Sequence, residues 1–217
     1  MKIKSAFVWE RFHKAPIIGI LRGITINQIE QVVSTYEAAE LTTLEVTMNT
    51  VGACEIIRSI RTNYPMLNIG AGTVRTVDDL QKALDTGAQF IVTPILNETV
   101  IKEAVAMGIP IFPGAFTPTE IYKAWTLGAS GVKLFPATQL GPQYVKDLLA
   151  PLNDLKIIPT GGVSAENIAA YFEAGAFGVG MGSSLIDKKL LQQEDYVALK
   201  NHFIRVKHEI KGFIKQG

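Results

Sequence analysis

The chain has 217 residues, and its 21 Lys and Arg residues almost balance its 20 Asp and Glu residues, for a formal net charge of +1. This balance argues against nucleic-acid or membrane-surface binding, because both usually rely on an excess of basic residues. Hydrophobic residues make up 47% of the chain and charged residues 19%, which is typical of a globular protein with a sizeable core.

Eight short runs rich in β-branched residues predict β-strands at near-regular intervals. They cover residues 17–21, 43–47, 68–72, 90–93, 109–112, 131–135, 156–160 and 177–181. Between these runs, apolar residues recur at helical spacing, as at Ile29, Val33 and Tyr36. Thr117 and Ser164 are predicted helix starts, because each is a hydroxyl residue with an acidic residue two or three positions later.

Eight strand–helix units without a linker predict an α/β fold, namely a single (β/α)₈ TIM barrel that covers residues 1–217. A doubly wound open sheet is the alternative, and it usually carries a dinucleotide or phosphate fingerprint after its first strand. Residues 21–25 (Leu-Arg-Gly-Ile-Thr) are not such a fingerprint, and residues 70–75 lack the third glycine of the motif. The barrel is therefore favoured.

Two helices are expected outside the repeated units. Residues 5–13 are predicted to form a helix that caps the floor of the barrel. Residues 196–215 are predicted to form a terminal helix, with Phe203, Val206, Ile210 and Phe213 on one apolar stripe.

The sequence also indicates where the protein is expected to act. Residues 1–14 carry charges throughout and contain no hydrophobic signal segment, and no apolar run approaches the ~18 residues of a membrane span. Cys54 is the only cysteine, which excludes an internal disulfide framework and a CxxC metal pair. We expect a cytoplasmic protein.

Polar residues gather at the predicted carboxyl ends of the strands, where the active sites of such barrels lie. They are Arg22, Glu45, Asn49, Thr73, Thr93, Lys133 and Thr160.

Lys133 and Glu45 are the most informative of these residues, because each is a lone charge in an apolar strand. Taken singly, each has an ordinary explanation: a lysine that reaches solvent, or one half of a structural ion pair. If both side chains point inward, however, an amine and a carboxylate enter one cavity. Burial lowers the pKa of a lysine, and a neutral lysine condenses with ketones. The pair therefore predicts Schiff-base chemistry.

Glycine-rich segments follow the last two predicted strands, at Gly161-Gly162 and at Gly182-Ser183. Loops at these two places form the recurrent phosphate site of the barrels, because glycine lets backbone N–H groups approach an anion closely. The alternative is that these glycines only make tight turns.

Metal catalysis and serine hydrolysis find little support. His13, His202 and His208 all fall in the predicted terminal extensions, away from the barrel mouth, so the site would lack both histidine ligands and a histidine base. We expect no metal and no cofactor.

Four stretches together resemble the 2-keto-3-deoxy-6-phosphogluconate/4-hydroxy-2-oxoglutarate (KDPG/KHG) aldolase family, over almost the full chain. They are residues 44–47 (Leu-Glu-Val-Thr), 70–74 (Gly-Ala-Gly-Thr-Val), 131–137 (Gly-Val-Lys-Leu-Phe-Pro-Ala) and 159–163 (Pro-Thr-Gly-Gly-Val). The resemblance implies a homotrimeric class I aldolase, in which Lys133 forms the Schiff base and Glu45 is the general acid/base.

The resemblance also implies a substrate site. Thr73 would help to hold the pyruvate carboxylate and Thr160 would line the site, while Pro94 and Phe135 are expected to contact the substrate. The loops at Gly161-Gly162 and Gly182-Ser183 would bind the phosphate.

One position departs from the gluconate-type members, which usually have a substrate-binding arginine where this chain has Asn49. Residues 20–24, Asn49 and residues 141–144 look more like the 6-phosphogalactonate branch. We hypothesise that Arg22 supplies the missing cation; the alternative is that Arg22 is an ordinary surface arginine.

The expected reaction is cleavage of 2-keto-3-deoxy-6-phosphogluconate, or of its 6-phosphogalactonate epimer, to pyruvate and glyceraldehyde 3-phosphate. Cleavage of 4-hydroxy-2-oxoglutarate to pyruvate and glyoxylate is a close alternative. More distant alternatives are a phosphate-binding isomerase or epimerase, and a phospho-sugar-binding barrel without catalytic activity.

Overall fold

The structure, a computed structural model, describes residues 7–214. Within this range, short parallel strands alternate with helices along the chain. The strands are β1 (Ile17–Leu21), β2 (Thr43–Thr47), β3 (Asn68–Gly72), β4 (Ile91–Val92), β5 (Ile111–Phe112), β6 (Gly114–Ala115), β7 (Val132–Leu134), β8 (Ile157–Pro159) and β9 (Val179–Met181).

The strands form a six-stranded sheet, in the order β5-β4-β3-β2-β1-β9, and a three-stranded sheet, in the order β6-β7-β8. One parallel bridge, between Thr160 and Gly180, links the chain just beyond β8 to β9. At the other junction, Pro113 alone separates β5 from β6.

The predicted α/β fold with parallel strands is therefore confirmed. A single barrel of eight regular strands is not observed within residues 7–214, because the strands form two sheets. The sequence predicts one strand over residues 109–112, whereas the structure has β5 before Pro113 and β6 after it. β6 pairs with β7, and the Lys133 N–H of β7 donates to the Pro113 carbonyl. Proline has no N–H to give to a strand ladder, and this interrupts the strand at residue 113. Regular pairing consequently divides into two sheets.

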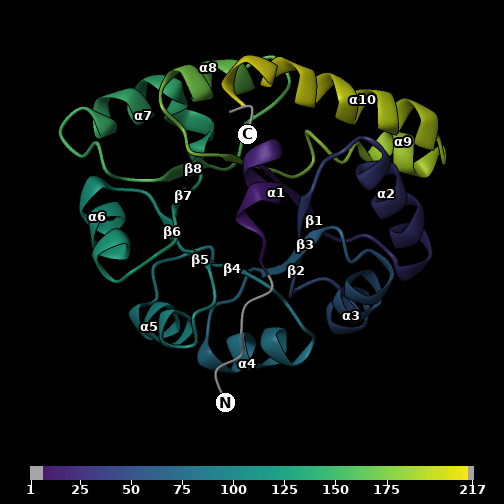
Figure 1. The fold of residues 1–217 in the computed structure, drawn as a ribbon, viewed down its shortest axis with the longest axis horizontal. Helices are drawn as coiled ribbons and strands as arrows, with labels where there is room; N and C mark the ends of the chain where they lie inside the picture. The colour runs from purple at the N-terminus through teal and green to yellow at the C-terminus, as the bar shows by residue number, and fades with distance from the viewer. Residues whose placement is uncertain (1–6, 215–217) are drawn as a thin grey trace.

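Helices surround the strands (Figure 1). They are α2 (Ile26–Ala38), α3 (Ala53–Asn63), α4 (Val77–Asp85), α5 (Glu98–Ala106), α6 (Pro118–Thr126), α7 (Gly141–Leu149), α8 (Ile168–Glu173) and α9 (Lys188–Gln192).

Of the two helix starts predicted above, one is confirmed. Thr117 and Glu120 form a reciprocal capping box at α6. Ser164, by contrast, does not begin a helix: α8 starts at Ile168, and Ser164 instead donates its N–H to the Asn167 side chain at 2.8 Å. The loop after β8 therefore extends to residue 167 and is longer than predicted.

The helix expected at the barrel floor is present as α1 (Trp9–Lys14), which lies over the centre of the ring of strands in Figure 1. Positions 5 and 6 of the predicted range lie outside the described residues. Phe12 on α1 is fully buried and belongs to an apolar cluster that fills the space inside the strands, together with Phe7, Ile18, Phe90, Val92, Phe112 and Ile158. Because α1 directly precedes β1, this cluster occupies the amino ends of the strands.

The expected terminal helix is α10 (Tyr196–Glu209), followed by the short 3₁₀ helix η2 (Lys211–Phe213). Phe203, Val206 and Ile210 are fully buried, as the predicted stripe requires. Phe213 departs from the stripe, because the α-helix ends before it; the residue is 40% exposed and its ring stacks on Phe172. Residue 215 lies outside the described range.

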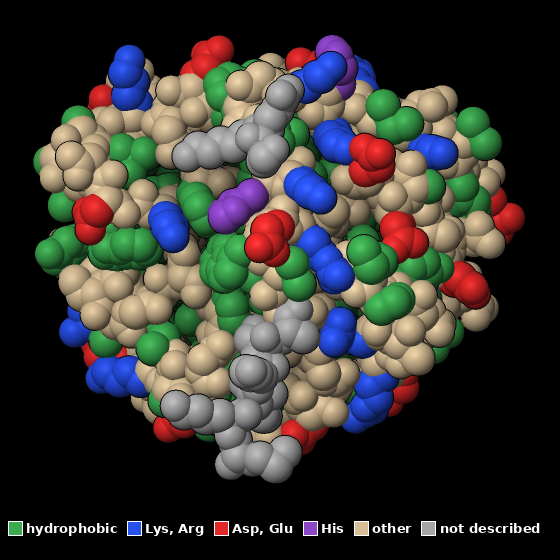
Figure 2. All heavy atoms as spheres, viewed as in Figure 1, with side chains coloured by type: hydrophobic (Ala, Val, Ile, Leu, Met, Phe, Trp, Pro, Cys, Tyr) green, Lys and Arg blue, Asp and Glu red, His purple; other side chains and the backbone are tan. Residues whose placement is uncertain are grey.

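The face that carries α1 shows basic and acidic side chains interspersed with apolar ones (Figure 2). Among the described residues, no helix has the length and apolarity to cross a membrane.

Candidate active site

The side chains of Lys133 and Glu45 both point into the space that the strands enclose. Lys133 on β7 is paired with Ile158 on β8, which belongs to the interior cluster, and Glu45 on β2 is paired with Ile20 on β1. Paired residues of parallel strands share a face, and Ile20 shares its face with the interior residue Ile18. Lys133 is 5% exposed and Glu45 is 1% exposed. The predicted burial of both charges in the interior is confirmed.

Burial moves both groups towards their uncharged forms. It lowers the pKa of the Lys133 amine, an effect that the Glu45 charge opposes and the Arg22 charge reinforces. Burial raises the pKa of the Glu45 carboxyl, and the charges of Lys133 and Arg22 oppose this shift. The site thus holds a lysine that loses its proton more readily than usual beside a carboxyl group that retains its proton more readily.

Lys133 and Glu45 do not form an ion pair with each other. Within residues 7–214, no ion pair within 4.0 Å joins Lys133 to Glu45, and the buried Oε2 of Glu45 has no hydrogen-bond partner. The Lys133 amine lies 4.9 Å from the centre of the Phe135 ring. A buried carboxylate oxygen without a partner is unfavourable in a purely structural role, so it points to a ligand.

Glycine on β3 makes room for the carboxyl group. A Cβ atom at Gly72 would lie 2.5 Å from Oε1 of Glu45, closer than the two atoms can approach. A side chain at residue 72 would therefore displace the carboxyl group from its present position.

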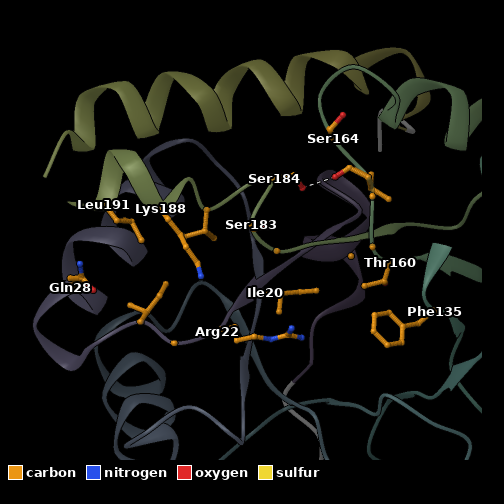
Figure 3. A pocket seen from close by; sticks show the side chains of 18 of the residues that line it. Ile20, Arg22, Gln28, Phe135, Thr160, Ser164, Ser183, Ser184, Lys188 and Leu191 are labelled. Atoms are coloured by element: carbon orange, nitrogen blue, oxygen red, sulfur yellow. Dashed lines mark hydrogen bonds between the residues drawn. The ribbon is translucent and has the colours of Figure 1, made fainter. Parts of the chain in front are cut away.

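A cavity of about 560 Å³ opens at the carboxyl ends of β1, β7, β8 and β9 (Figure 3). Seven of the predicted site residues line it: Arg22, Phe135, Thr160, Gly161, Gly162, Gly182 and Ser183. Lys133 and Glu45 are not part of this lining, but two lining residues interact with them. The Phe135 ring contacts the Lys133 amine, and the Arg22 charge shifts the pKa of both groups.

The two glycine-rich segments meet at this cavity and are bonded to each other. Gly161 and Gly162 both have positive φ, of 93° and 77°, which favours glycine. The Ser184 hydroxyl donates to the Val163 carbonyl at 2.5 Å and so joins the loop after β9 to the loop after β8. The prediction that these loops come together is confirmed. Residues of both loops form one wall of the cavity.

Arg22 reaches into the cavity from the end of β1, towards Phe135 and Thr160 (Figure 3). Its loop is held against the loop after β2, since the Gly23 N–H donates to the Thr50 hydroxyl at 3.2 Å. Asn49, in this second loop, is exposed and lies outside the lining of the cavity.

The other predicted positions lie around the strand ends. Thr73 follows β3 with φ of +58°, a left-handed conformation that is costly for a β-branched residue and is found mainly at functional sites. Thr93 is fully buried and donates to the Ile95 carbonyl, whereas Pro94 is half-buried against Gly114. Thr73 and Pro94 are absent from the cavity lining, so their contact with substrate stays a prediction.

One charged residue of the cavity lining and one histidine behind the lining are not predicted from the sequence. Lys188, the first residue of α9, lines it. His202 on α10 donates from its Nε2 to the carbonyl of Ser184, a lining residue, at 2.8 Å. None of the three histidines is in the cavity lining, but His202 supports the cavity wall through this hydrogen bond. Neither residue is at a predicted strand end, so no local pattern marks them.

Within the described residues, no group of three or more His, Cys, Asp and Glu side chains is placed to hold a metal ion.

Comparison with known proteins places the chain in a family. The model of the KDPG and KHG aldolase family matches residues 8–202. The 2-dehydro-3-deoxy-6-phosphogalactonate aldolase of Escherichia coli is 38% identical over 79% of this chain and 85% of its own length. The 2-dehydro-3-deoxy-phosphogluconate aldolase of Haemophilus influenzae is 34% identical over 90% of this chain and 93% of its own length. A solved structure described as native KDPGal superimposes with a TM-score of 0.86 at 32% identity, covering 94% of this chain and 98% of its own. The chain belongs to the KDPG and KHG aldolase family.

Proposed function

We propose that this protein is a class I aldolase that cleaves a phosphorylated 2-keto-3-deoxy sugar acid to pyruvate and glyceraldehyde 3-phosphate. The observation that carries the proposal is the buried pair of Lys133 and Glu45, with a lowered pKa on the amine and an unpartnered carboxyl oxygen. The relatives named as phosphogalactonate and phosphogluconate aldolases support it.

The chemistry begins at the C2 ketone. Neutral Lys133 attacks this carbon to give a carbinolamine. The protonated Glu45 carboxyl gives its proton to the departing hydroxyl group, so loss of water leaves a protonated imine on Nζ and a carboxylate on Glu45. The Glu45 carboxylate then takes the proton of the C4 hydroxyl, the C3–C4 bond breaks, and its electron pair moves towards the iminium nitrogen to form an enamine. Glyceraldehyde 3-phosphate departs. Glu45 returns the proton to C3, and water releases pyruvate and the free amine.

The remaining predicted residues have binding roles in this scheme. We assign Arg22 and Thr73 to the pyruvate carboxylate, and Phe135, Thr160 and Pro94 to the walls around the C2–C4 atoms. Asn49 is the position that departs from the gluconate-type pattern. The loops with Gly161, Gly162, Gly182 and Ser183 take the phosphate, because their glycines expose backbone N–H groups to the cavity.

Trapping of the imine tests the proposal directly. Borohydride added in the presence of pyruvate should attach a stable adduct to Lys133, identified by peptide mass spectrometry. Lys133→Met should abolish the adduct, whereas Lys156→Met should keep it, because Lys156 lies beside Trp9 and Phe177 at the amino ends of the strands. A folded wild-type protein that forms no adduct would refute the aldolase mechanism and favour an isomerase or a non-catalytic sugar-binding barrel.

The C4 epimers, gluconate and galactonate, are distinguished by a side-by-side cleavage assay. Cleavage of 4-hydroxy-2-oxoglutarate is the second candidate activity, favoured by the family description, which includes KHG aldolases.

The proposal extends to the assembly. We infer a homotrimer in the cytoplasm, built from one domain of residues 1–217 in which β5 and β6 count as one strand of an eight-stranded barrel. Light scattering should give three times the chain mass of 23.6 kDa; a mass of one chain would contradict the trimer.

A further inference from the structure

The cavity at the strand ends is lined by two charged side chains, both cationic. These are Arg22, from the loop after β1, and Lys188, from the start of α9; the described lining contains no Asp or Glu. A cavity with one cation on each of two walls suits a ligand with two separated anionic groups.

The two cations are not equivalent. Arg22 lies near the reacting groups, because its charge contributes to the pKa shifts of both Lys133 and Glu45, and Lys188 is not among the charges that do so. Lys188 extends from α9 into the cavity, on the side of the loop that carries Ser183 and Ser184 (Figure 3). Arg22 thus lies on the side of Lys133 and Glu45, and Lys188 lies on the side of the loop after β9 (Figure 3).

Lys188 is also available to a ligand. Within residues 7–214, no hydrogen bond or ion pair within 4.0 Å engages its amine. The adjacent acid, Asp187, uses its carboxylate as a cap that accepts the N–H groups of Lys189 and Leu190. An exposed lysine directed into a cavity without acidic residues stabilises an anion there.

We propose that Lys188 binds the phosphate of the substrate and thereby makes the enzyme prefer phosphorylated sugar acids over 4-hydroxy-2-oxoglutarate. The inference rests on the proposed aldolase function and deepens it. 4-Hydroxy-2-oxoglutarate is shorter and ends in a carboxylate, so it places no phosphate beside Lys188. The residue acts on substrate choice, while Lys133 and Glu45 carry out the bond cleavage.

The test compares Lys188→Met with Lys189→Met. Lys189 is the next residue of α9, is exposed and does not line the cavity, so it is a matched control for the loss of one positive charge. Lys188→Met should raise KM for the phosphorylated substrate by about 10- to 100-fold, the size expected for one charge-assisted hydrogen bond. KM for 4-hydroxy-2-oxoglutarate, kcat for both substrates and pyruvate trapping should stay near wild type. Lys188→Arg should restore most of the affinity.

A second measurement probes the phosphate itself. Inorganic phosphate should inhibit cleavage competitively in the wild type and in Lys189→Met, and much more weakly in Lys188→Met. Equal effects of Lys188→Met on both substrates, or equal effects of the two Met variants, would overturn the inference although the aldolase survives. A wild type that traps no pyruvate and cleaves neither substrate would instead overturn the proposed function.

Discussion

At the scale of single residues, two buried ionisable groups and one glycine define the proposed reacting centre. Lys133 and Glu45 are each placed where charge is disfavoured, so their protonation depends on each other and on Arg22. Gly72 leaves the space that the Glu45 carboxyl occupies. Burial thus favours the neutral, nucleophilic form of the Lys133 amine. More polar surroundings would raise the pKa of the amine and reduce the fraction in this form.

Replacement of Glu45 by glutamine tests this coupling. Glu45→Gln should lower kcat for cleavage by about 10²- to 10⁴-fold, the usual contribution of a positioned acid/base. The Glu45 charge raises the pKa of Lys133, so its removal should lower that pKa further. Imine trapping requires the neutral amine and is lost as the pH falls through the Lys133 pKa. The pH at which trapping fails should therefore be lower in Glu45→Gln than in wild type; a shift to higher pH would contradict the coupling.

At the scale of elements, the two glycine-rich loops at the cavity are supported by a distant helix. The loop after β9 is joined to the loop after β8 through Ser184, and α10 holds the same serine through His202. The cavity wall therefore depends on a helix that contributes no lining residue itself.

Removal of the His202 side chain should loosen this wall. His202→Ala deletes the hydrogen bond to the Ser184 carbonyl, so we expect KM for the phosphorylated substrate to rise about fivefold, the equivalent of about 1 kcal/mol. Pyruvate trapping should be unaffected, because Lys133 lies elsewhere. His208→Ala is the control, since His208 is exposed on the same helix. The positioning role is wrong if both variants have the same KM.

At the scale of the whole molecule, the two ends of the strands have different tasks. Aromatic residues close the amino ends: Phe12 contacts Phe7, Trp9, Phe112 and Phe177, with ring centres 5.4 to 6.4 Å apart. The carboxyl ends stay open and polar. This division lets the protein stabilise one end and keep strained or unpartnered groups, such as Thr73 and Glu45, at the other.

Truncation of Phe12 measures the contribution of the closed end. Phe12 is fully buried, so Phe12→Ala should lower the free energy of unfolding by about 3–5 kcal/mol through lost burial and a residual cavity. Phe213→Ala, at a ring that is 40% exposed, should cost clearly less. Denaturant unfolding provides both values, and the folded fraction of Phe12→Ala should still trap pyruvate. Loss of trapping in folded Phe12→Ala would show that the two ends are not independent.

Elements with a local signal can be predicted from the amino-acid sequence alone. The bounds of β1, β2 and β3 agree with the predicted runs, because buried parallel strands are continuous apolar segments. Lys133, Glu45 and the glycine pairs were found in the same way, since a lone charge in an apolar strand and a glycine after a strand are visible without a fold.

Which distant segments share the cavity follows from long-range packing and not from local sequence. Lys188, on α9, lines the cavity from outside the predicted strand ends. His202, on α10, bonds the backbone of the lining residue Ser184. The split of the fifth strand at Pro113 was missed because strand pairing depends on the neighbouring strands and not on the apolar run alone. The orientation of Arg22 was open for the same reason: a side chain at a strand end can face solvent or cavity, and the packing of the surrounding loops selects the cavity.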